Sequence, residues 1–194
     1  MRFPPWLRLS LLVALLFGVW GALIEVPEKH FQPGFPATLG YVVWSLTMVP
    51  CALIALSRAG WRLDHTFRSV FYGALVGLSG AAGQLGLFQA LKEGPAYLVF
   101  PMISLAPAVT IVMSTWFLRE RTHPVATAGV LLSVTAIPLL SLQMPDTRAP
   151  IDGYTWLGYS AAALLLWGAQ SYFIKASAGA VSSESLFFYM AAGA

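Results

Sequence analysis

Long apolar runs, separated by short segments that hold nearly all of the charges, constrain this chain more than any other feature. The runs cover residues 9–24, part of 32–57, then 69–91, 94–118, 124–144 and 153–174, and a seventh begins near Leu186. A helix needs about 20 mostly apolar residues to cross the hydrocarbon core of a bilayer. The pattern therefore predicts an all-α, polytopic membrane helix bundle with six spans and the start of a seventh, in contact with membrane lipids.

The composition favours the same interpretation. Hydrophobic residues make up 58% of the chain and charged residues 10%, whereas soluble domains carry about 25% charged residues. The first run could instead be a cleaved signal peptide, but no small-residue cleavage site follows it, and Trp20 crowds the expected position. The single cysteine, Cys51, excludes a disulfide framework, and the three histidines lie apart in loops. We expect no metal site, no cofactor and no nucleic-acid partner.

Basic residues are distributed unevenly among the loops, and this predicts the orientation of the chain. With a cytoplasmic N-terminus, eight Lys and Arg residues lie inside and three lie outside. This bias follows the rule that cytoplasmic loops are enriched in basic residues. The inside set is Arg2, Arg8, Arg58, Arg62, Arg68, Arg119, Arg121 and Lys175, and the outside set is Lys29, Lys92 and Arg148.

A short internal similarity suggests that the chain contains a repeat. The tripeptide Trp-Gly-Ala occurs at residues 20–22, at the end of the first run, and again at 167–169, late in the sixth. The same offset of 147 residues brings the start of the second run onto the start of the seventh. A repeat unit of five spans would insert its two copies in opposite directions, as in many transporters. We therefore predict a first five-helix repeat at 1–144 and the truncated start of an inverted second repeat at 145–194.

Three segments in the third to fifth runs carry a family signature. They are residues 87–96 (LFQALKEGPA), 101–110 (PMISLAPAVT) and 118–121 (LRER). The chain resembles the drug/metabolite transporter superfamily in its EamA-type branch. This resemblance implies ten helices in two inverted repeats, with both termini cytoplasmic. It also implies movement of a small metabolite or drug-like molecule across the plasma membrane. The ten helices would need a complete second repeat or a second subunit.

One face of the third run combines small residues with a buried amide. Gly73, Gly77 and Gly80 fall on the same side of a helix, where they would let another backbone approach closely. Gln84 lies on that same face, near the middle of the membrane. Its amide would need a hydrogen-bond partner there, either on another helix or on a substrate. Both alternatives remain open on the sequence alone.

The other candidate cavity residues lie on the first, fourth and sixth runs. Pro101 and Pro107 should kink the fourth run, because proline removes a backbone donor and clashes with the preceding turn. We expect a cavity between the first, third, fourth and sixth runs, where such transporters hold a substrate near the midplane. The predicted cavity residues are Trp20, Gln84, Tyr97, Ser104 and Gln170, with Glu25 near the outer mouth.

These features favour a secondary transporter that works by alternating access. A membrane-embedded enzyme and a non-transporting interaction protein are the alternatives. An enzyme of that kind should show clustered Asp, Glu or His residues at the membrane surface, and the chain lacks such clusters. It also lacks a phosphate-binding loop of the G-x-x-x-x-G-K-[ST] type. We therefore expect no enzymatic activity and no catalytic residue.

Overall fold

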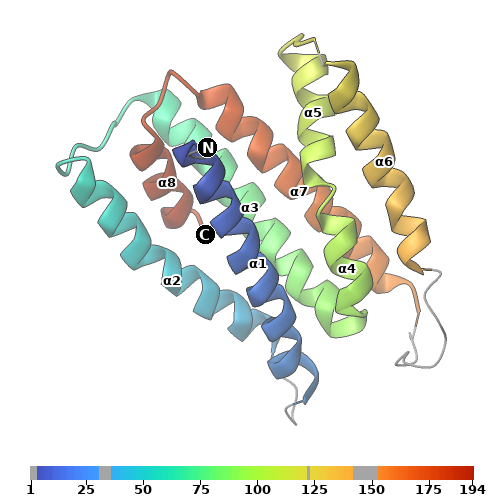
Figure 1. The fold of residues 1–194 in the computed structure, drawn as a ribbon. Coiled ribbons are helices and arrows are strands. Elements are labelled where there is room, and N and C mark those ends of the chain that lie inside the picture. The colour runs from blue at the N-terminus through green and yellow to red at the C-terminus, as the bar shows by residue number, and fades with distance from the viewer. Residues whose placement is uncertain (1–3, 31–35, 122, 142–152) are drawn as a thin grey trace. The chain divides into compact units, whose positions relative to one another are not determined.

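The computed structural model describes residues 4–30, 36–121, 123–141 and 153–194, apart from some side chains in the first and sixth helices. All regular elements of the described residues are helices (Figure 1). They are α1 (Pro5–His30), α2 (Ala37–Arg58), α3 (Phe67–Glu93), α4 (Ala96–Ile103), α5 (Ala106–Phe117), α6 (Pro124–Ser141), α7 (Thr155–Ser177) and α8 (Ser183–Ala192). The chain forms two compact units, residues 1–36 and 37–194. The first unit consists of α1, and the second holds the other described helices.

Within the described residues, four segments are long and apolar enough to cross a membrane. They are Leu7–Ile24, Ala37–Arg58, Phe67–Glu93 and Ala96–Phe117. This result confirms the predicted polytopic helical membrane bundle. The fifth and sixth predicted spans correspond to α6 and α7, which are not among the four, so their membrane crossing stays a prediction. In α7, Gln170, Lys175 and several aromatic side chains lower the mean hydropathy.

The fourth span is divided into α4 and α5, and the interruption falls at Ser104 and Leu105. Pro101 lies inside α4, and Pro107 lies in the first turn of α5. A proline at position 107 has no N–H to donate to the carbonyl of Ile103, and its ring crowds that carbonyl. A tighter turn replaces the missing bond, with the N–H of Leu105 donating to the carbonyl of Met102 at 3.2 Å.

α3 is the central helix of the second unit, and its N-terminus is fixed by side-chain hydrogen bonds. Thr66 caps the helix by accepting a hydrogen bond from the backbone N–H of Ser69 at 3.3 Å. The hydroxyl of Ser69 donates to Asp64 at 2.7 Å, and the N–H of Thr66 donates to the other oxygen of that carboxylate at 3.0 Å. These bonds, with the one from the Ser69 hydroxyl foremost, lower the pKa of Asp64, because they stabilise its charged form.

The loop before α3 and the turns that follow α5 and α7 lie at one end of the second unit, which we call the basic end (Figure 1). The N–H of Asp64 donates to the hydroxyl of Ser185 at the start of α8, at 2.9 Å, and the hydroxyl of Tyr189 donates to the carbonyl of Asp64 at 3.1 Å. At the same end, Lys175 pairs with Glu120 beyond α5. The three connections that the sequence assigned to the cytoplasm therefore lie together. Which side of the membrane they face stays a prediction.

The predicted boundary between the repeats falls at residues 144 and 145, outside the described residues. On either side of it, α3 and α7 pack together within one compact unit. The predicted repeat boundary lies within the unit of residues 37–194, and the two repeats stay a prediction. α8 begins at Ser183, three residues before the expected start of the seventh span, because Ser182 caps it by accepting from the N–H of Ser185.

Candidate functional site: the interface of α3 with α7 and α8

The glycines of α3 lie against the backbones and bulky side chains of α7 and α8. A Cβ atom added at Gly73 would lie 2.2 Å from the Cβ of Tyr189. At Gly77, an added Cβ would lie 2.9 Å from the carbonyl oxygen of Met190. Neither distance leaves room for a methyl group. Glycine at these positions is what lets α8 approach α3 this closely.

Further along α3, the neighbouring helix is α7, and it runs antiparallel to α3. A Cβ at Gly80 would lie 2.3 Å from the amide nitrogen of Gln170, and one at Gly83 would lie 2.4 Å from the indole ring of Trp167. The indole N–H of Trp167 also donates to the carbonyl of Gly80, at 3.4 Å. The structure therefore brings Gln170 and the face that carries Gly80 and Gln84 together. It also adds Trp167, which was not among the predicted cavity residues.

The amide of Gln170 is weakly held. Its Nε2 atom donates to the sulfur of Met190 on α8, at 3.5 Å. A thioether sulfur is a poor acceptor, so a carbonyl oxygen could replace it with a gain in hydrogen-bond strength. Met190 was not a predicted site residue. No sequence signal distinguished it, because a methionine in an apolar run is ordinary packing material.

Gln84 lies one helical turn beyond Gly80, on the same face of α3. Its side chain is only 3% exposed. Its Nε2 atom is buried and has no hydrogen-bond partner among the described residues. Leaving a buried donor unsatisfied costs about 1–3 kcal/mol. Gly80 is the middle residue of α3 (Phe67–Glu93), so this unpartnered donor lies close to the midplane of the predicted span.

A hollow of about 230 Å³ opens next to this cluster, towards the basic end. Met190 connects the hollow to Gln170, because it lines the hollow and its sulfur accepts the hydrogen bond from the amide of Gln170. The lining residues come from α3, α7, α8 and the turn between the last two: Val76, Ile174, Ser177, Ala178, Val181, Ser183, Leu186, Phe187 and Met190. None of them is ionisable, so the hollow is neutral as well as largely apolar.

Two predicted cavity residues on the fourth span, Tyr97 and Ser104, are exposed and do not line this hollow. Tyr97 is 42% exposed, and Ser104 is also exposed. The hydroxyl of Ser104 donates to the carbonyl of Phe100 in its own helix, at 2.7 Å. Neither residue lines the hollow described above. The structure therefore does not bring them together with Gln84 as expected, and their contact with a substrate stays a prediction.

Trp20 and Glu25 belong to α1, which forms its own unit. The ring of Trp20 lies 5.5 Å from that of Phe17 on the same helix. The side chain of Glu25 lies outside the described residues. Their predicted places in the cavity and at its outer mouth therefore stay predictions.

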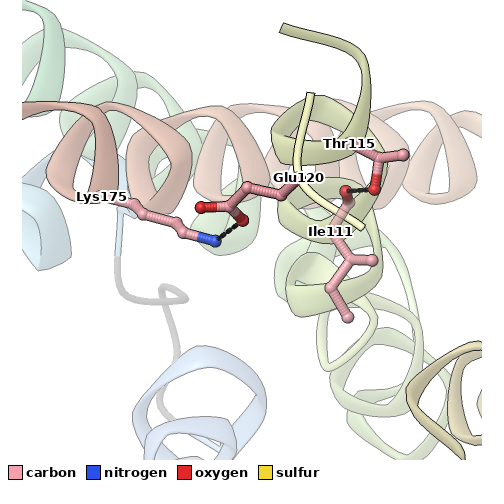
Figure 2. Close-up of polar contacts among 4 residues, drawn as sticks. All are labelled: Ile111, Thr115, Glu120 and Lys175. Carbon is pink, nitrogen blue, oxygen red and sulfur yellow. Dashed lines mark hydrogen bonds and ion pairs between the residues drawn. The ribbon is translucent and has the colours of Figure 1, made fainter. Parts of the chain in front are cut away.

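Polar contacts also join α5 to α7. The hydroxyl of Thr110 donates to the carbonyl of Gly168 at 3.0 Å, and at the basic end Glu120 pairs with Lys175 (Figure 2). Arg119 has a left-handed backbone (φ 54°) and turns the chain just before Glu120. Among all the described residues, no group of three or more His, Cys, Asp or Glu side chains is placed so that it could hold a metal ion.

The sequence of the chain is similar to that of known proteins. The EamA-like transporter family matches residues 4–142, which is most of the chain. An uncharacterised protein of Methanocaldococcus jannaschii is 29% identical over 135 residues, which cover 69% of this chain and 94% of that relative. No solved structure matches. Because the family match spans the first five predicted helices, as the signature segments had indicated, the chain is a multi-pass membrane protein that belongs to the EamA-like transporter family.

Proposed function

We propose that the chain is a secondary transporter that moves a small, non-polymeric solute by alternating access. The observation that carries the proposal is the amide nitrogen of Gln84, which has no hydrogen-bond partner among the described residues. It is buried near the middle of a spanning helix, on the face where α3 meets α7. Unsatisfied polar groups at that depth are costly and mark solute pathways in membrane proteins. A solute with a hydrogen-bond acceptor would satisfy the amide in one state of the transport cycle.

The interface between α3 and α7 also suits alternating access. α3 belongs to the predicted first repeat and α7 to the predicted second, so a rocking motion of one repeat against the other would open and close the region around Gln84. At this contact Gly80 and Gly83 present no side chains of their own, so the side chains of Gln170 and Trp167 on α7 would meet no opposing side chain at these two positions as α7 moves along α3.

We further propose that a second five-helix unit completes the transport path, either as the remainder of an inverted second repeat or as a second subunit. The archaeal relative supports the second possibility, because its matched 135 residues are 94% of its length and it is thus close to one repeat in size. We place the protein in the plasma membrane with a cytoplasmic N-terminus, on the basis of the charge bias.

The test is a transport measurement with a matched glutamine control. Membrane vesicles that contain the protein are incubated with a metabolite extract, and the solutes taken up are identified by mass spectrometry. Gln84→Leu should reduce uptake at least tenfold with unchanged protein level. Gln89→Leu, on another face of α3, should reduce it much less. Equal uptake by the Gln84→Leu protein and the unmodified protein would refute the role of this amide.

A further inference from the structure

We propose that the hollow between α3, α7 and α8 binds an uncharged, ring-sized solute that carries a hydrogen-bond acceptor. The apolar body of the solute would fill the hollow, and its acceptor would take the amide N–H of Gln170, which donates to Met190 in the lining of the hollow. This inference rests on the proposed function and names the class of solute that such a transporter would accept.

The size of the hollow sets the size of the solute. Its volume is about 230 Å³. An engineered apolar cavity of about 150 Å³ binds benzene, so a single substituted ring fits this hollow and leaves space for a polar group. Val76 lines it on α3, and Leu186, Phe187 and Met190 line it on α8. Burial of a ring against such side chains is the main source of affinity in small-molecule sites.

The hydrogen-bonding groups that could recognise a solute lie near Met190 and Ser177. The hydroxyl of Ser177 already donates to the carbonyl of Ile174 at 2.8 Å. The amide of Gln170 has only the sulfur of Met190 as its acceptor, and the amide nitrogen of Gln84 has none among the described residues. A carbonyl or ether oxygen next to Met190 would displace this weaker sulfur contact and accept from the amide of Gln170. The site therefore selects a solute that accepts hydrogen bonds.

The charge of the solute follows from the lining. No ionisable side chain lines the hollow, and the stretches from Ser69 to Leu91 and from Thr155 to Ile174 contain none except tyrosines. A cation or an anion placed there would lose its hydration without gaining a countercharge, and that loss is far larger than one hydrogen bond restores. A neutral solute avoids this cost.

Three probes of the same shape separate these requirements: 4-fluorobenzamide, 4-fluorobenzoate and 4-fluorobenzylammonium. Their binding to the full chain in nanodiscs is measured by fluorine NMR, and empty nanodiscs give the correction for partition into lipid. We expect the amide to bind at least tenfold more tightly than either charged probe. Comparable binding of all three probes would overturn the inference.

Two variants locate the bound probe. Gln170→Leu should weaken 4-fluorobenzamide binding about fivefold to tenfold, the effect of losing one hydrogen bond at a buried site. Val181→Trp, at the rim in the turn before α8, should fill the hollow and abolish binding while leaving the helices intact. Gln89→Leu should change nothing. Unchanged binding to the Val181→Trp protein would place the probe elsewhere and refute the site, whether or not the Gln170 variant folds.

The same measurements distinguish this inference from the proposed function. If vesicles take up a solute in a manner that depends on Gln84, but the neutral probe binds no better than the charged ones, the function stands and the solute class is wrong. If the probe binds in the hollow but no solute enters vesicles, the site stands and the transport proposal is wrong.

Discussion

Substitution of Gly168 tests whether close contact between α5 and α7 holds the second unit together. An added Cβ at this position would lie 2.4 Å from the Cβ of Val109 and 3.1 Å from the carbonyl oxygen of Ala106. Ordinary van der Waals contact begins near 3.4 Å, so the two helices would have to separate by about 1 Å. The Cγ1 of Val109, at 2.6 Å, could rotate away, but the Cβ of Val109 and the carbonyl oxygen of Ala106 could not. The strain therefore falls on the helix contact itself.

The expected size of the effect follows from two opposing terms. Forcing one extra methyl group into a packed contact costs about 1–3 kcal/mol, and the separation would also stretch the hydrogen bond from Thr110 to the carbonyl of Gly168. Replacing a helical glycine by alanine returns about 1 kcal/mol through helix propensity. Gly158 provides the control on the same helix, because nothing lies within 4 Å of its added Cβ. Gly158→Ala should be neutral or slightly stabilising.

Thermal unfolding of both variants in one detergent gives the measurement. A difference of 1 kcal/mol corresponds to a Tm shift of roughly 2–4 °C for a chain of this size. We expect Gly168→Ala to unfold several degrees below Gly158→Ala. If Gly168→Ala unfolds at the same temperature as the control or above it, the close α5–α7 contact is not a source of stability and the reasoning fails.

Three further predictions concern the basic end of the second unit. The lowered pKa of Asp64 means that its charged form contributes stability at neutral pH; Asp64→Ala should unfold at a lower Tm at pH 7, and the difference should shrink as the pH falls through the lowered pKa, below the ordinary value of 3.8. Glu120→Lys should lower the Tm slightly, and adding Lys175→Glu should restore it. The change in the free energy of unfolding should not exceed about 1 kcal/mol, because both side chains of the pair are about half exposed. If the double exchange leaves the Tm low, the pairing is wrong. Cysteines placed at Arg62 and Glu120 in a Cys51→Ser chain should both resist an impermeant thiol reagent added outside intact cells, and labelling of only one would contradict their location on the same side.

The elements that the sequence predicted well are those fixed by local signals. The helical spans follow from hydropathy, since the bilayer core excludes unpaired backbone groups and leaves the helix as the form that satisfies them. The break in the fourth span lies between Pro101 and Pro107, because each proline removes a backbone donor at a known position. The basic loops gather at one end because connections that follow alternate spans emerge on the same side.

The surroundings of single side chains were harder to predict. Tyr97 and Ser104 were predicted to line a cavity; both are exposed, and their contact with a solute stays a prediction. In a soluble protein, a polar and an apolar face tell which side of a helix is buried. In a membrane, lipid and protein interior are both apolar, so hydropathy does not separate them. The glycine positions of α3 were informative because small residues mark a close helix contact, whatever surrounds the rest of the helix.

The buried amide of Gln84 has two interpretations: it either packs against a neighbouring helix or binds a solute. A packing role requires that its amide be paired across the interface, because the gain from an interhelical hydrogen bond is the reason to keep an amide there. The neighbouring amide of Gln170 meets this condition weakly, through a sulfur atom, whereas the nitrogen of Gln84 does not meet it among the described residues. A leucine would fill the position without an unsatisfied donor and at lower cost in this state. The amide is therefore better explained by a partner that is present only during part of the transport cycle, which supports solute binding over packing as its role.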